Sequence, residues 1–216
     1  MHNTLVNLIE IQKKIQLKID KNRLPKIIAV SKTHPMISIL PLINAGHLDY
    51  GENKVQEAIE KWTEVKKNNP YIKLHLIGKL QTNKVKGAVK IFDYIHSLDN
   101  EKLANKIADE QSKQNRKIKI FIQINIGNED QKSGVKKDNI LDFYKYCKNL
   151  NLNVIGTMCI PPKEDNSQNH FLEMNKINTK LNLLDLSMGM SEDYLEAAQN
   201  CSTFLRIGSK IFGQRN

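Results

Sequence analysis

Long apolar runs are absent from the sequence. None of its apolar stretches approaches the roughly 18 to 20 residues that a membrane-spanning helix needs. The first twenty residues carry acidic side chains and no small-residue cleavage site, which argues against a secretory signal peptide. Cysteine is also scarce, because Cys147, Cys159 and Cys201 are an odd and widely spaced set. These thiols argue against a disulfide framework and are typical of a reducing cytosol. We therefore expect a cytoplasmic protein with no membrane partner.

Arginine is rare in an otherwise basic chain. Lysine supplies 29 of the 33 basic residues, and the net charge is +10. Together with abundant asparagine and isoleucine, this usage is what an A/T-biased genome produces, and it indicates a solvated lysine-rich surface. A polyanion-binding face is the alternative. No basic stripe interleaved with aromatic residues and no nucleic-acid-binding motif supports that alternative, so we expect no nucleic-acid partner.

Several motifs with known chemistry are missing. The sequence has no GxGxxG, no GxxxxGK[ST] and no nucleophile elbow, which argues against dinucleotide dehydrogenases, nucleotide triphosphatases and α/β-hydrolases. The six histidines include no i, i+4 pair and no spacing to cysteine that resembles a zinc site, so we expect no metal. His75 interrupts an apolar run and is predicted to be a core histidine with satisfied hydrogen bonds. No linker divides the 216 residues, whose number fits one large domain or at most two small ones.

The sequence does contain a regular alternation of short apolar runs and amphipathic stretches. Leucine and isoleucine at helical spacing predict an opening helix over residues 3–20. The apolar runs predict strands at 27–30, 47–51, 73–78, 93–97, 118–125, 153–159, 184–188 and 204–208. Helices are predicted between them, including 54–66, 100–114, 138–150, 167–182 and 191–199, the last with Ser191 as its N-cap. Eight βα units predict an α/β fold, a small (β/α)8 barrel, and an open doubly wound parallel sheet is the alternative.

The run over residues 118–126 has a strict period of two. Isoleucine occupies every even position, and polar or aromatic residues occupy the odd positions. In a barrel the isoleucines would face the helices. Gln123 and Asn125 would then line the polar upper interior.

Ligands bind at the carboxyl ends of the strands in both architectures, so the residue after each apolar run matters most. Lys32 follows Ile27–Val30, where a desolvated amine has a lowered pKa and is a nucleophile for Schiff-base formation. The alternative is a lysine whose ammonium reaches out to solvent from the strand end.

Two glycine- and serine-containing segments are candidates for a phosphate site. Ser191 lies at the start of a predicted helix, where free N–H groups and the helix dipole attract anions. Gly208 allows close backbone approach, and Ser209 offers a hydroxyl donor. Barrel phosphate sites often use the loops after strands seven and eight. The alternative is that Ser191 merely caps its helix.

Arg206 lies inside the apolar stretch Phe204–Ile207. A buried guanidinium needs acceptors. A structural salt bridge would satisfy it, and so would an aromatic ring nitrogen of a bound cofactor.

Seven segments in this order resemble the signature of the pyridoxal phosphate homeostasis proteins (the YggS/PROSC family). They are IAVSKT (28–33), GENKVQE (51–57), HLIGKLQTNK (75–84), KSG (132–134), MCIP (158–161), LSMGMS (186–191) and RIGS (206–209) with Phe212-Gly213. Each is modest alone, but the ordered set is highly specific. Departures from the family pattern are few, namely His34, Leu74 and Lys79.

The resemblance implies a single (β/α)8 barrel domain over residues 1–216, like the N-terminal domain of alanine racemase (fold type III of the pyridoxal phosphate enzymes), with an extra N-terminal helix. It implies pyridoxal 5′-phosphate (PLP) held as a Schiff base on Lys32. Ser191, Gly208 and Ser209 match the family's phosphate cradle. Arg206 matches the arginine that faces the pyridine nitrogen, and Asn53 matches the asparagine beside the ring. Lys132 matches a lysine proposed as an accessory cofactor site.

The resemblance also implies a role in vitamin B6 homeostasis rather than catalysis. An arginine at the pyridine nitrogen makes the ring a poor electron sink, and we expect no second domain to supply a second base. We therefore expect a monomer without catalytic turnover, with PLP-dependent apoenzymes as possible acceptors. A small PLP-dependent amino-acid racemase is the alternative function. A third is an interaction module that uses its basic surface.

Overall fold

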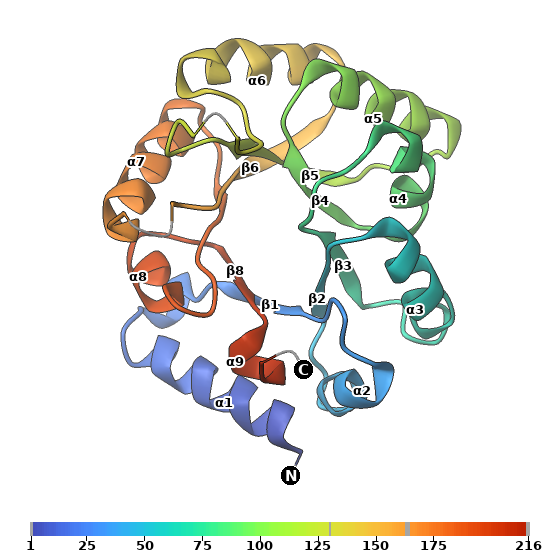
Figure 1. Ribbon diagram of the computed structural model, residues 1–216, viewed down its shortest axis with the longest axis vertical. Coiled ribbons are helices and arrows are strands. Elements are labelled where there is room, and N and C mark those ends of the chain that lie inside the picture. The colour runs from blue at the N-terminus through green and yellow to red at the C-terminus, as the bar shows by residue number, and fades with distance from the viewer. Residues whose placement is uncertain (1, 130, 163–164, 215–216) are drawn as a thin grey trace.

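Eight parallel strands close into a barrel in the computed structural model, which describes residues 2–129, 131–162 and 165–214. Each strand pairs with the next one in the chain, and β8 pairs with β1. Figure 1 shows the strands enclosed by a ring of helices. The (β/α)8 barrel predicted from the sequence is thus confirmed, and the open sheet is excluded because the first and last strands are bonded to each other. The strands are β1 (Lys26–Val30), β2 (Asp49–Glu52), β3 (Lys73–Leu76), β4 (Tyr94–Leu98), β5 (Lys119–Ile124), β6 (Asn153–Cys159), β7 (Asp185–Ser187) and β8 (Phe204–Ile207).

The helices lie close to the predicted ranges where the amphipathic pattern is long. They are α1 (Asn3–Gln16), α2 (Met36–Asn44), α3 (Val55–Asn68), α4 (Val85–Ile91), α5 (Glu101–Lys113), α6 (Ile140–Asn149), α7 (Ser167–Lys180), α8 (Tyr194–Gln199) and α9 (Ser209–Phe212). Short 3-10 turns occur at η1 (Lys21–Arg23), η2 (Thr82–Lys84) and η3 (Lys137–Asn139).

Two predicted helix boundaries are wrong. The opening helix ends at Gln16 rather than at residue 20, because the Asp20 side chain instead accepts the Asn22 N–H (2.8 Å) and caps η1. Helix α8 begins at Tyr194 rather than at Ser191, because the Asp193 carboxylate accepts the Met190 N–H (2.6 Å) and holds a turn there. Ser191 is therefore not the N-cap of this helix.

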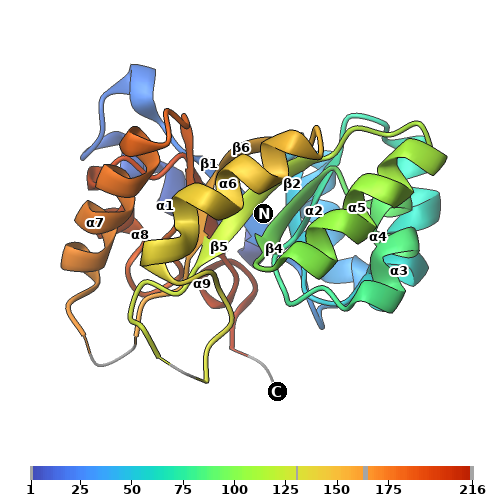
Figure 2. The same cartoon turned by 90° about the horizontal axis from the view of Figure 1, so that it is seen from above.

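The N-terminal helix completes the outer ring. The helix after β8, α9, has only one turn, and α1 lies in the ring between α8 and α2 (Figure 1). The Asn7 side-chain amide donates to the Ile211 carbonyl (3.0 Å), which ties α1 to α9. The described parts of the loops after β5 and β6 project from one end of the barrel (Figure 2).

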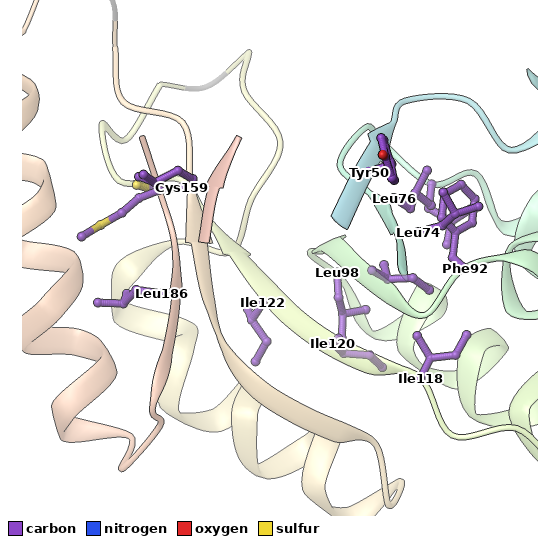
Figure 3. Close-up of a cluster of buried hydrophobic side chains, with 14 of the residues drawn as sticks. Tyr50, Leu74, Leu76, Phe92, Leu98, Ile118, Ile120, Ile122, Cys159 and Leu186 are labelled. Atoms are coloured by element: carbon purple, nitrogen blue, oxygen red, sulfur yellow. The ribbon is translucent and has the colours of Figure 1, made fainter. Parts of the chain in front are cut away.

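Apolar side chains fill both faces of the barrel wall. Ile120, Ile122 and Ile124 belong to the large core between strands and helices, so the predicted period of two is confirmed. Figure 3 shows part of this core, with Cys159 and Leu186 pointing from their strands toward the neighbouring helix. A smaller cluster, Ile28, Tyr94, Phe121, Met158 and Phe204, fills the barrel interior. The barrel is therefore packed rather than hollow, as is usual for this architecture.

In the part of the chain that the structure describes, no helix is both long and apolar enough to cross a bilayer. The same residues contain no cluster of three or more His, Cys, Asp or Glu side chains suited to a metal ion.

Candidate functional site

A cavity of about 930 Å³ opens at the carboxyl ends of the strands. All six site residues predicted from the sequence line it, and they come from segments far apart in the chain. They are Lys32 after β1, Asn53 after β2, Ser191 after β7, Arg206 on β8, and Gly208 and Ser209 at the junction of β8 and α9. The fold thus brings every one of these side chains or backbone positions to the same cavity.

Lys32 lies just after the carboxyl end of β1, and hydrogen bonds fix the residues on either side of it. The preceding Ser31 is fully buried, and its hydroxyl donates to Glu52 Oε1 (2.7 Å). The following Thr33 adopts φ = 64°, a left-handed conformation that β-branched residues rarely take. Its N–H donates to Glu57 Oε1 (2.7 Å). Lys32 is half-buried and lines the cavity. The carboxylates of Glu52 and Glu57 fix the residues on either side of it.

These carboxylates belong to a partly buried charged network that was not predicted from the sequence. Glu52 Oε1 accepts from Ser31 Oγ, from Lys61 Nζ (3.1 Å) and from Trp62 Nε1 (2.9 Å). Lys61 Nζ also donates to Glu57 Oε1 (3.0 Å) and to the Ser31 carbonyl (3.0 Å). Partial burial acts to raise the pKa of Glu57, but the Thr33 N–H and Lys61 outweigh it and hold that pKa below its usual value. The i, i+4 spacing of Glu57 and Lys61 was the sequence signal from which their ion pair could have been predicted.

Arg206 is buried and points its guanidinium across the barrel. One Nη donates to Ser187 Oγ (2.8 Å) and the other to the Cys159 carbonyl (2.8 Å). Burial lowers the pKa of Arg206, but an arginine side chain remains charged at neutral pH. No ion pair in the described part of the chain involves it, so the structural salt bridge considered above is not observed. A guanidinium has five N–H donors, which leaves donors for a ligand in the cavity.

Hydroxyl groups and close backbone packing form the opposite end of the cavity. Ser191 Oγ accepts the Lys210 N–H (3.4 Å), which joins the loop after β7 to α9. A Cβ at position 208 would lie 3.3 Å from Val30 Cβ, a tight contact that glycine avoids. Gly189 has φ = 89°, and a Cβ there would lie 2.4 Å from Ala197 Cβ. Ser209, at the start of α9, is exposed to the cavity.

Asn53 owes its position to a second glycine. A Cβ at Gly78 would lie 2.4 Å from the Asn53 carbonyl oxygen, so glycine lets the β3 loop pack directly on the residue after β2. His34 also lines the cavity, and its ring stacks on Phe212 with a centroid distance of 4.8 Å. In the sequence, His34 is distinguished only as a departure from the family pattern.

No described residue of the loop after β5 lines the cavity. Lys132 forms an ion pair with Glu129 and is not among the lining residues. Asn125, predicted to line the upper interior, instead bonds the backbone of Glu129 twice, through its Nδ2 (2.8 Å) and its Oδ1 (3.1 Å). Gln123 Nε2 donates to the Ser133 carbonyl (3.1 Å). Both amides therefore bond the backbone of this loop, and neither lines the cavity.

The donor set of the cavity fits PLP. An amine at one wall can react with an aldehyde, a charged donor can face a ring nitrogen, and serine hydroxyls beside an uncrowded glycine backbone can bind a phosphate. A cavity of this volume falls in the usual range for small-molecule and cofactor sites.

Comparisons with known proteins agree with this chemistry. The profile of the alanine racemase N-terminal domain family matches residues 6–216. The pyridoxal phosphate homeostasis protein of Pasteurella multocida (strain Pm70) is 36% identical over 225 residues, which cover 97% of this chain and 97% of that protein. The protein of the same name from Escherichia coli (strain K12) is 31% identical over 230 residues, which cover 100% of this chain and 98% of that protein.

Solved structures show the same relationship. PipY, the COG0325 family member of Synechococcus elongatus PCC7942, with PLP bound, has a TM-score of 0.85 and 30% identity, covering 97% of this chain and 100% of that one. Alanine racemase of Clostridium difficile 630 shares the fold alone, with a TM-score of 0.75, 14% identity and coverage of 99% of this chain and 57% of that one. The chain therefore belongs to the alanine racemase N-terminal domain family and, within it, to the pyridoxal phosphate homeostasis proteins.

Proposed function

We propose that this protein binds PLP covalently on Lys32 and serves PLP homeostasis in the cytoplasm as a single-barrel monomer. The observation that carries the proposal is the convergence of Lys32, Arg206 and the Ser191–Ser209 pair on one cavity. The names of the relatives and the PLP bound to PipY support it. The described cysteines are all free thiols, which supports a reducing compartment.

Each residue has a distinct task in this proposal. Lys32 would supply the neutral amine that holds PLP as a Schiff base, with the aldehyde oxygen released as water. When bound, PLP supplies the aldehyde for this reversible step. Ser191, Ser209 and the backbone at Gly208 hold the phosphate, Arg206 donates an N–H to the pyridine nitrogen, and Asn53 contacts the ring.

We infer a carrier or buffer rather than a catalyst. A permanently charged donor at the pyridine nitrogen leaves that nitrogen unprotonated, so the ring withdraws electrons poorly and does not stabilise a carbanion. The cavity is also open to water, which weakens electrostatic catalysis. PLP-dependent apoenzymes would be the acceptors of the bound cofactor.

The test is the visible absorption spectrum of the protein with added PLP, recorded before and after borohydride reduction. Peptide mapping of the reduced protein then locates the modified lysine. We expect a yellow species that reduces onto Lys32 and is lost in Lys32→Ala. Lys79→Ala is the matched control, because Lys79 is an exposed lysine outside the cavity. An adduct scattered over surface lysines would refute the proposal. Interconversion of D- and L-amino acids that requires Lys32 and persists through purification would establish the racemase alternative instead.

A further inference from the structure

A chain of hydrogen bonds crosses the barrel interior and ends at Arg206. The Asp49 carboxylate lies 2.9 Å from His75 Nε2, and His75 Nδ1 lies 3.0 Å from His96 Nε2. His96 Nδ1 lies 2.8 Å from Ser187 Oγ, which accepts from Arg206. The five residues come from β2, β3, β4, β7 and β8, and of these only Arg206 lines the large cavity.

The chain connects the two ends of the barrel. Asp49 lines a second, smaller cavity of about 320 Å³ at the amino ends of the strands, whereas Arg206 lines the large cavity at the carboxyl ends. His75, His96 and Ser187 are fully buried between them. The His75 ring stacks on Tyr94 at 4.2 Å, and the His96 ring stacks on Phe121 at 4.3 Å. These aromatic rings pack against the histidines and exclude bulk water from the chain.

The residues at the two ends, Arg206 and Asp49, fix the direction in which protons are donated along the hydrogen-bond chain. Arginine only donates, so Ser187 Oγ accepts from Arg206 and has its own proton left to give to His96 Nδ1. His96 then carries its proton on Nε2 and donates it to His75 Nδ1. His75 in turn carries its proton on Nε2 and donates it to Asp49, which as a carboxylate only accepts. Every group is satisfied, and both histidines are neutral.

The opposite direction would leave one contact unsatisfied. If His96 donated from Nδ1, then His75 would donate from Nδ1, and its bare Nε2 would face the bare carboxylate oxygen of Asp49. A charged imidazolium or a protonated Asp49 would be needed to repair that contact. Burial lowers the pKa of His75 and lowers that of His96 well below its usual value, which disfavours the imidazolium. Burial acts to raise the pKa of Asp49, but the His75 contact outweighs it and the net direction is down, which disfavours the protonated acid.

We propose that Asp49, His75 and His96 are positioning residues, which act through Ser187 to orient the Arg206 guanidinium toward the large cavity. The orientation of Arg206 concerns this chain alone, while its consequence for the bound cofactor rests on the proposed function. Arg206 has no ion-pair partner in the described residues, so two acceptors hold its guanidinium: the Cys159 carbonyl, and Ser187 at the end of the hydrogen-bond chain from Asp49.

The first arm of the test uses ligand-free protein and nitrogen-15 NMR of the histidine and arginine side chains. We expect His75 and His96 to be neutral Nε2–H tautomers. In Asp49→Asn we expect their tautomer populations and the Arg206 Nε signal to change. Tyr94→Phe is the matched control: it keeps the ring stacked on His75 and removes a hydroxyl that contacts Lys119 rather than the chain. An Nδ1–H or doubly protonated histidine in the wild type overturns the directed chain, without reliance on any variant.

The second arm measures PLP binding to the same proteins. Loss of one buried hydrogen-bond arrangement predicts a Kd about two- to tenfold higher in Asp49→Asn and in Ser187→Ala, with a shifted absorption maximum of the bound cofactor. Unchanged Kd, absorption maximum and Arg206 signal in Asp49→Asn would overturn the positioning role. If the wild type fails to bind PLP on Lys32, the proposed function falls, and the ligand-free Arg206 and histidine signals still decide the orientation of Arg206.

Discussion

The backbone N–H of Thr33 donates a 2.7 Å hydrogen bond to Glu57 Oε1, from the residue after the cavity lysine to the first turn of α3. Thr33 is held at φ = 64°, a conformation that costs a residue with a Cβ roughly 1 to 2 kcal/mol. Strained backbone of this kind persists only where the surroundings enforce it. Helix α3 therefore sets the direction in which Lys32 leaves β1.

Removing the Glu57 carboxylate is expected to loosen Lys32. Glu57→Ala leaves the Thr33 N–H without its acceptor and Lys61 without one partner. A hydrogen bond to a charged group contributes roughly 1.5 to 3 kcal/mol, so we expect PLP affinity measured by absorption titration to fall about tenfold. Glu60→Ala is the control, because Glu60 lies on the same helix and bonds only Gln56 among the described contacts. Equal affinities in both variants would contradict the positioning of Lys32 by α3.

Substitution of Thr33 by glycine is expected to relieve the strain. Thr33→Gly should raise the free energy of unfolding by up to about 1 kcal/mol, since relief of the left-handed conformation exceeds the added chain entropy. The opposite change, Gly46→Ala, should lower it by about 1 kcal/mol, because Gly46 has φ = 82° and no neighbour within 4 Å. Urea unfolding of both variants measures whether the free energy of unfolding rises in Thr33→Gly and falls in Gly46→Ala. A destabilised Thr33→Gly would show that the threonine side chain, rather than the turn, matters.

The proposed phosphate site can be tested by removing the serine hydroxyls from the protein and, separately, the phosphate from the ligand. Ser191→Ala and Ser209→Ala remove hydroxyls at one end of the cavity, and pyridoxal lacks the phosphate that they would bind. Each variant should weaken PLP binding about threefold to tenfold, as expected for one lost hydrogen bond, and should leave pyridoxal binding unchanged. Ser167→Ala removes another cavity-lining hydroxyl, which bonds Glu196 instead, and serves as the control. Equal losses for PLP and pyridoxal would place the phosphate elsewhere.

Much of the fold could be predicted from the sequence, because strands and amphipathic helices produce local patterns of apolar residues. The Ile118–Ile126 alternation predicted which face of β5 meets the helices, and the apolar runs predicted all eight strands. The site residues followed from what stands after each run, since a parallel barrel gathers strand ends at one mouth. His75 is likewise a core histidine with both nitrogens bonded, as predicted.

What could not be read depended on contacts between distant segments. The start of α8 is a local exception: the Asp193 carboxylate accepts the Met190 N–H, and this turn competes with a helix that begins at Ser191. The Glu52–Lys61–Glu57 network needs β2 and α3 packed together. The relation of His75 to His96 and Ser187 exists only once the sheet has closed, because the three lie on β3, β4 and β7.

Stability is expected to fall as the pH drops below neutrality, because the barrel buries neutral histidines. Burial lowers the pKa values of His75, His96 and His47 in the folded protein, whereas the unfolded chain titrates at about 6.5. Below that pH the unfolded state binds more protons, so each histidine destabilises the fold by up to about 1.4 kcal/mol per pH unit. Urea unfolding at pH 7 and pH 5 should therefore show a loss of stability with falling pH.

Replacement of His96 should make this loss smaller. In His96→Gln one buried titrating group is gone, so the fall in unfolding free energy between pH 7 and pH 5 should shrink even though the variant is less stable at pH 7. Tyr94→Phe should keep the wild-type slope, since burial raises the pKa of Tyr94 further above this range. A slope in His96→Gln equal to that of the wild type would mean that His96 has the same pKa in the folded and the unfolded chain, which would contradict its burial as a neutral group. A steeper slope in His96→Gln would mean that His96 is already protonated in the folded barrel, and the directed hydrogen-bond chain to Arg206 would fail with it.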